Sequence, residues 1–229
     1  ISIAVVDDTL DEAAETVIVT LSSPTNATLG SDSAHTYTIN DNDDAPTIDF
    51  NVTSSNGAES ASTAILTVDL SAASSNAVTV GYTLAGTATG GGTDYTLANG
   101  TLTIAAGQTS GSISIAGIID DTLDELNETV IVTLSNPANA TLGSDSVYTY
   151  TINDNDAAPT VDFNVTSSNG AESVNSVDLV VDLSAVSGRS VSVNYAIGGT
   201  AIGNGTDHSL SNGTLDIAAG ASSGTLVMN

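Results

Sequence analysis

An all-β fold built as tandem antiparallel sandwiches is what this sequence predicts, and three observations indicate it. The 229 residues are rich in Val, Ile and Thr and include 21 glycines, a composition that favours strands and turns over helices. No segment keeps an apolar period of 3.6 residues, so we expect negligible helix content. Short alternating segments recur between Gly, Asn and Ser turns, at the spacing typical of a β-sandwich.

An internal repeat sets the domain organisation. Asp120 follows Asp7 by 113 positions, and the same offset joins Pro46 to Pro159 without any insertion. Proline cannot donate to a strand ladder, and Asn/Asp clusters favour turns, so the Asp-rich segments before Pro46 and Pro159 indicate boundaries between β-units. We therefore expect the C-terminal part of one domain (1–43), a complete domain (44–156) and the N-terminal part of a third (157–229).

The complete unit contains seven candidate strands. They have alternating patterns, such as Ile65 and Thr67 against Leu66 and Val68, and Gly-rich turns lie between them. In chain order the expected strands are Thr47–Thr53, Thr63–Leu70, Val78–Leu84, Gly100–Ile104, Ser110–Ile119, Glu128–Leu134 and Ser146–Ile152.

The charge of the chain excludes several classes of function. There are 27 acidic residues against a single base, Arg189, which gives a formal charge of −26. Nucleic acids and anionic membrane surfaces both require a basic footprint, so neither is expected as a partner. The absence of Cys rules out disulfides, thiol catalysis and thiolate zinc sites. Two interpretations of the acids remain: a high-salt solubility surface, or carboxylates that bind metal ions.

The stretch Asp120–Glu128 concentrates five carboxylates in nine residues, directly before the apolar alternation of a strand. So much negative charge beside a buried strand is unfavourable unless a cation or bulk water compensates it. All six Glu residues of the chain occupy three repeat positions that flank loops, whereas a merely solvating surface would scatter them over the strands. This distribution favours a metal site, with a solvated acidic loop as the alternative.

Calcium is the cation that such ligands suit. It takes roughly six to eight oxygen ligands, with Glu often bidentate, so several loops must converge at one end of the sandwich. The candidate ligands of the complete domain are Glu59, Asp94, Asp120, Asp121, Glu125, Glu128, Asp154 and Asp156. The repeat extends this set to Asp7, Asp8, Glu12, Glu15, Asp41, Asp43, Glu172 and Asp207.

A series of short motifs in this chain resembles the Calx-β repeat. The motifs are Gly57-Ala58-Glu59, Val78-Thr79-Val80-Gly81-Tyr82, Gly86-Thr87-Ala88, Asp94-Tyr95, Gly100-Thr101-Leu102-Thr103-Ile104, Gly107, Asp120-Asp121 with Glu125 and Glu128-Thr129, Ala140-Thr141-Leu142-Gly143, and Asp154-Asn155-Asp156. The resemblance covers the whole chain with circularly shifted ends. It implies an Ig-like seven-stranded sandwich that binds Ca²⁺ near the domain junction, through the candidate ligands of the complete domain. Two positions depart from the pattern: Asn155 stands where Asp is frequent, and His208 replaces the Tyr95 of the preceding repeat.

Other kinds of site find no support. His35 and His208 lack partner ligands, and no Ser-His-Asp arrangement recurs between the repeats, so we do not expect an enzyme. We expect an extracellular calcium-binding structural repeat, in the stalk of an adhesin, a surface layer or a surface filament. A regulatory calcium sensor and a ligand-binding adhesin head are the alternatives.

The partners that we expect are neighbouring repeats of the same protein. No apolar run is long enough to span a bilayer, no signal peptide opens the chain, and both ends fall inside strand-like sequence. We read the chain as a window on a longer repeat protein. The alternative is that the tail of one subunit completes the head of the next by strand complementation, which would give a head-to-tail filament.

Overall fold

The computed structural model describes residues 1–229 and contains sixteen strands and no helix, which confirms the predicted all-β class. None of the chain therefore forms a helix that could cross a membrane. The residues group into two compact units. Unit 1 comprises residues 1–57, 62–118 and 129–151, and unit 2 comprises residues 58–61, 119–128 and 152–229.

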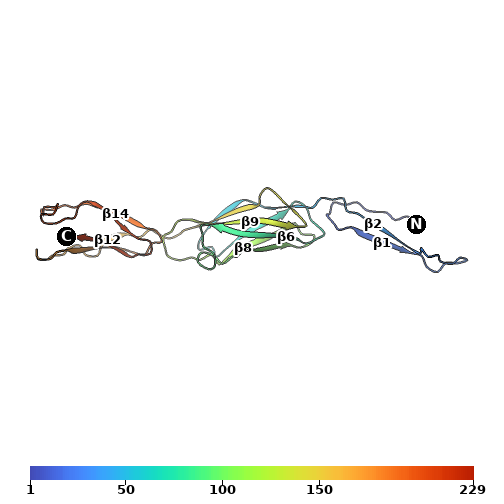
Figure 1. Ribbon diagram of the computed structural model, residues 1–229, viewed down its shortest axis with the longest axis horizontal. Helices are drawn as coiled ribbons and strands as arrows, with labels where there is room; N and C mark the ends of the chain where they lie inside the picture. Colours follow the sequence, from blue (N-terminus) through green and yellow to red (C-terminus); the bar gives the residue numbers. More distant parts are fainter. The chain divides into compact units, whose positions relative to one another are not determined.

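The middle repeat forms the expected β-sandwich from two sheets. One sheet has the order β10-β3-β5-β8, and the other has the order β4-β11-β9-β6-β7, so β8 and β9 belong to different sheets (Figure 1). Their bounds are β3 Thr47–Phe50, β4 Ser54–Ala58, β5 Thr63–Leu70, β6 Val78–Gly86, β7 Gly100–Ile104, β8 Ser110–Ala116, β9 Glu128–Ala138, β10 Thr141–Leu142 and β11 Val147–Asn153.

Six of the seven predicted strands are confirmed, two with the predicted bounds and four with shifted ends, but the first is not continuous. The predicted strand Thr47–Thr53 ends after Phe50, and the chain resumes as β4 in the opposite sheet. The exposed bend between them is held by the Asn51 side chain, whose Nδ2 donates to Asp69 Oδ2 at 2.8 Å. A strand that changes sheets in this way serves both layers of a sandwich. The short strand β10, parallel to β3, was also not predicted.

The core of the middle repeat consists of apolar side chains that alternate with outward-facing residues along the strands. On β5, Leu66 and Val68 are fully buried, while Ile65 and Thr67 are exposed on the other face. The β9 residues Val130, Val132 and Leu134 are buried in the same alternating way. The rings of Phe50 and Tyr148 meet edge to face, with centroids 5.2 Å apart. Because the period of a strand is two, the buried apolar residues of each strand share one face.

The first repeat contributes one two-stranded sheet. Strands β1 (Glu15–Thr20) and β2 (Ala34–Ile39) pair antiparallel, with Val17 opposite Tyr37. They correspond through the repeat to β9 and β11. Their apolar side chains are more open than those of the middle repeat: Ile18 is 63% exposed and Tyr37 is 47% exposed.

The third repeat forms two small sheets in unit 2. The first has the order β12-β13-β16 and the second pairs β14 with β15. Their bounds are β12 Val161–Phe163, β13 Val177–Leu183, β14 Val191–Tyr195, β15 Gly213–Ile217 and β16 Ser223–Met228. Val181, Leu183 and Ile217 form their common core.

Candidate metal centre

Three carboxylates from three separate segments converge within unit 2. Glu59 follows directly after β4, Asp121 lies in the loop that precedes β9, and Asp156 follows β11. One oxygen of each lies within 4.8 Å of the others. Glu59 is the most enclosed of the three, with only 8% of its surface exposed. Convergence from several loops is what a calcium site requires.

The loop between β8 and β9 carries Asp120, Asp121, Asp124 and Glu125 and is called the acidic loop below. Its own side chains hold its conformation. Asp121 Oδ1 accepts a hydrogen bond from the Leu123 amide at 2.8 Å, a local turn that Asp favours. The loop is also tied to the segment after β11. Asn155 Nδ2 donates to Asp120 Oδ1 at 3.1 Å. The amide at the position where the resemblance leads one to expect Asp therefore supplies a donor that a carboxylate lacks.

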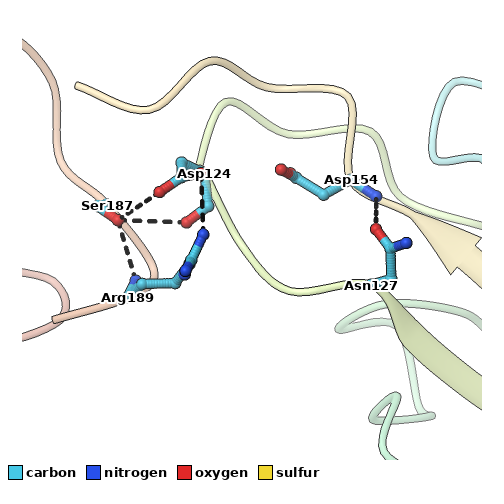
Figure 2. Close-up of polar contacts among 5 residues, drawn as sticks. All are labelled: Asp124, Asn127, Asp154, Ser187 and Arg189. Atoms are coloured by element: carbon cyan, nitrogen blue, oxygen red, sulfur yellow. Dashed lines mark hydrogen bonds and ion pairs between the residues drawn. The ribbon is translucent and has the colours of Figure 1, made fainter.

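A second tie comes from Asn127, whose Oδ1 accepts a hydrogen bond from the Asp154 backbone amide at 3.1 Å (Figure 2). This contact fixes the start of the Asp154–Asp156 segment beside the end of the acidic loop. Asn127 was not among the candidates from the sequence. Its role carried no signal there, because the first repeat has Ala14 at the corresponding position.

The convergence changes the acidity of the carboxyls. Burial, followed by the charges of Asp154 and Asp121, raises the pKa of Glu59 from 4.5 to about 7. Burial and the neighbouring Asp154 and Asp120 also raise the pKa of Asp156. Both shifts have the direction expected when like charges share a partly dehydrated site.

The donor set fits a calcium ion. Two carboxylate oxygens, Asp154 Oδ1 and Asp156 Oδ2, are buried and have no hydrogen-bond partner in the protein. A buried carboxylate oxygen without a donor is unfavourable unless a cation or water satisfies it. The converging ligand atoms all belong to carboxylates, with no sulfur and no imidazole, which is the chemistry of a hard cation such as Ca²⁺.

The first repeat holds a corresponding acidic centre in unit 1. All six of its candidate ligands line one cavity of about 120 Å³, namely Asp7, Asp8, Glu12, Glu15, Asp41 and Asp43. Its loop folds in the same way, since Asp8 Oδ1 accepts from the Leu10 amide at 2.9 Å and Asn42 Nδ2 donates to Asp7 Oδ1 at 3.3 Å. Burial and neighbouring acids raise the pKa values of Glu12 and Asp43.

The remaining candidates lie as follows. Glu125 and Glu128 are half-buried, the first in the acidic loop and the second as the first residue of β9. Asp94 Oδ2 accepts from the Thr89 amide at 2.5 Å, and its repeat counterpart Asp207 accepts from the Ile202 amide at 2.7 Å. These two carboxylates therefore close their own loops. Glu172 is exposed in a turn. Their assignment as ligands stays a prediction.

The family model of the Calx-beta domain matches residues 1–43, 41–156 and 154–227, which together cover nearly the whole chain. The chain belongs to the Calx-β family. The resemblance noted in the motifs is thereby confirmed, and Calx-β domains are calcium-binding modules.

Solved structures of Calx-β domains resemble this chain. CBD12 from CALX1.2 is 20% identical to this chain, with a TM-score of 0.45. The match covers 80% of this chain and 73% of the CBD12 chain. The apo-form Calx CBD1 domain is 24% identical, also with a TM-score of 0.45, and the match covers 49% of this chain and 100% of the CBD1 chain. A comparison with curated proteins found no match. The family assignment rests on the family model.

Proposed function

We propose that this chain is a tandem structural module whose acidic centres bind Ca²⁺ and thereby stiffen the loops at the ends of the repeats. The observation that carries the proposal is the convergence of Glu59, Asp121 and Asp156 within 4.8 Å, together with the unpartnered buried oxygens of Asp154 and Asp156. In a chain with one base, no neighbouring side-chain cation is available to neutralise most of these acids.

Calcium would supply the missing positive charge. Glu59, Asp121, Asp154 and Asp156 are the residues that would hold it, and Asn127 and Asn155 would keep their segments in place. Without the ion, the carboxylates repel one another and favour looser loops. With the ion, segments from three parts of the chain are joined at one point, so rigidity and resistance to proteases should increase.

An extracellular location and a stalk-like or filamentous role complete the proposal. The chain has no disulfide to stabilise it, and the millimolar calcium outside cells would be enough to occupy even a weak site of this kind. The partners that we propose are neighbouring repeats. Association of separate copies is also part of this proposal, since β1–β2 is a two-stranded sheet with exposed apolar residues such as Ile18 and Tyr37.

Calcium binding can be tested directly by equilibrium dialysis of the full chain against the variant Asp121→Asn. Asn preserves the turn to Leu123 but removes the charge, so we expect fewer ions per chain with an unchanged fold. Asp178→Asn, which changes an exposed aspartate of β13, is the matched control and should leave the ion count unchanged. A wild-type chain that takes up no calcium at millimolar free concentration would refute the proposal.

The same titration separates the stalk from the regulatory sensor. A stalk needs only millimolar affinity, whereas a sensor of cytosolic calcium must respond at micromolar levels or below. A midpoint well below micromolar would therefore favour the sensor. Sedimentation velocity at increasing protein concentration tests association of separate copies: a filament would give growing species, and a monomer at all concentrations would exclude self-assembly by this chain.

A further inference from the structure

One acid of each acidic loop, Asp124 or Asp11, is not a candidate ligand. Asp124 lies outside the converging group of Glu59, Asp121 and Asp156, as Asp120, Glu125 and Glu128 also do, but unlike them it was not predicted to bind an ion. Its counterpart Asp11 does not line the cavity of the first repeat, although its neighbour Glu12 does. These two aspartates occupy the same repeat position, and the sequence had suggested no role for either.

Both aspartates instead contact a buried serine of the following repeat. Ser187 Oγ donates to Asp124 Oδ2 at 3.1 Å (Figure 2), and Ser74 Oγ donates to Asp11 Oδ2 at 2.9 Å. Each serine is 1% exposed. The backbones meet as well, because each pair forms an isolated parallel β-bridge. The first contact lies within unit 2 and the second within unit 1, so the arrangement occurs twice.

Each serine is held by its own repeat in a way that leaves its proton for the aspartate. The carbonyls of Ser74 and Ser187 accept from the amides of Gly107 and Gly220, both at 2.9 Å. The hydroxyl oxygens accept from the amides two residues on, at 3.1 Å and 3.0 Å. A hydroxyl has a single proton, and here it points to the loop of the preceding repeat. Without the aspartate, a buried donor would lose its charged acceptor.

The residue after each serine is small. A Cβ on Gly188 would lie 2.5 Å from Glu125 Oε1, so a side chain there would move the end of that glutamate. In the first contact the position holds Ser75, whose hydroxyl donates to the Asp11 carbonyl at 3.0 Å. The acidic loop thus fits a serine followed by a small residue.

Arg189 adds an ion pair at one of the two contacts only. Its guanidinium lies 3.7 Å from Asp124 Oδ1 but is 51% exposed, and the first repeat boundary has Asn76 instead. Exposed ion pairs contribute little. The feature common to both contacts is the serine–aspartate pair.

We propose that Asp11 and Asp124 are docking residues, not ion ligands, and that each acidic loop carries beside its metal centre a surface for the next repeat. The partner that this surface fits is a Calx-β repeat with a buried serine and a small residue after it, at the positions of Ser74-Ser75 and Ser187-Gly188. The inference goes beyond calcium binding, because these contacts involve no ion.

Amide hydrogen exchange of the full chain tests the docking. The Gly188 amide donates to the Asp124 carbonyl at 3.1 Å, and the Ser75 amide donates to the Asp11 carbonyl at 3.0 Å. In metal-free protein, we expect Ser187→Ala to accelerate exchange at Gly188 roughly fivefold while Ser75 is unchanged. Ser74→Ala should have the opposite pattern. The control Ser184→Ala removes a hydroxyl that bonds Thr160 within its own repeat, and it should affect neither amide.

The variant Asp124→Ala removes the carboxylate that accepts from Ser187 and leaves the third repeat unaltered. It should accelerate Gly188 to the same extent and leave the number of bound calcium ions unchanged in native mass spectrometry. Unchanged Gly188 exchange in both Ser187→Ala and Asp124→Ala would overturn the proposal, and so would a lost ion in Asp124→Ala. If the wild-type chain binds no calcium, the proposed function fails, but the exchange comparison in metal-free protein still decides the docking.

Discussion

Among the residues of the candidate metal centre, Glu59 shows most directly how burial changes the pKa of a carboxyl. It lies in a turn after β4, is 8% exposed, and faces the charges of Asp154 and Asp121. Its repeat counterpart Glu172 is exposed. The same residue type at equivalent positions therefore stands in two different environments, which provides an internal control.

The variant Glu59→Gln should separate charge repulsion from ion binding. Without calcium, we expect it to raise the free energy of unfolding by about 1–3 kcal/mol, because a carboxylate among like charges is removed. With calcium, the variant should gain less stability than the wild type. Chemical unfolding in chelator and in calcium measures both effects. Glu172→Gln should change neither, and an equal response of the two variants would contradict the assignment of Glu59.

The stability of the metal-free chain should depend on pH through Glu59. Its pKa is 4.5 when unfolded and about 7 in the folded chain, so the folded state holds the proton more tightly. This contribution is fully present below pH 4.5 and is lost as the pH rises through 7, a decrease of about 3 kcal/mol. Bound calcium favours the ionised carboxylate and should abolish the decrease. Melting temperatures from pH 4 to 8 in both states check this, and parallel curves would contradict it.

At the scale of elements, strand positions were readable from the sequence because apolar residues alternate with the period of a strand. Thr63–Leu70 and Gly100–Ile104 were predicted with the bounds that the structure has. The split between β3 and β4 could not be predicted, because apolar alternation gives no sign of it. The bend there carries the hydrogen bond from Asn51 to Asp69 on β5, a contact that exists only in the folded chain. The acids of the loops were likewise identifiable by type and repeat position. Which of them meet depends on tertiary contacts such as Asn127 with Asp154.

Leucines at equivalent positions of different repeats should differ in how much stability is lost when the side chain is truncated to Ala. Leu134 on β9 is 1% exposed, and its counterpart Leu21 beside β1 is 54% exposed. Leu134→Ala should destabilise the middle sandwich by about 2–5 kcal/mol, because it removes buried methyl groups and leaves a cavity. Leu21→Ala should cost about 0.5 kcal/mol or less. Urea unfolding monitored by exchange of the β9 amides measures the first effect, and similar costs for both would contradict the burial pattern.

At the scale of the whole molecule, the charge of −26 has two possible explanations, a halophilic surface or a set of cation sites. They differ in what relieves the repulsion. Monovalent salt screens surface charge in general, with a Debye length of about 10 Å at 0.1 M, whatever the arrangement of the acids. A centre in which carboxylates converge requires a divalent ion at that point. The repeat positions of Glu and the unpartnered oxygens of Asp154 and Asp156 favour the second explanation.

Thermal unfolding of the full chain with calcium, with chelator, and with sodium chloride at matched ionic strength tests the central claim most directly. Ligand that binds only the folded state stabilises it by about 2.7 kcal/mol at a hundredfold excess over the dissociation constant. We therefore expect calcium to raise the melting temperature by several degrees, and sodium chloride at the same ionic strength to raise it much less. Melting curves that coincide in calcium and chelator, or an equal rise in sodium chloride, would contradict the calcium centre and leave the halophilic surface.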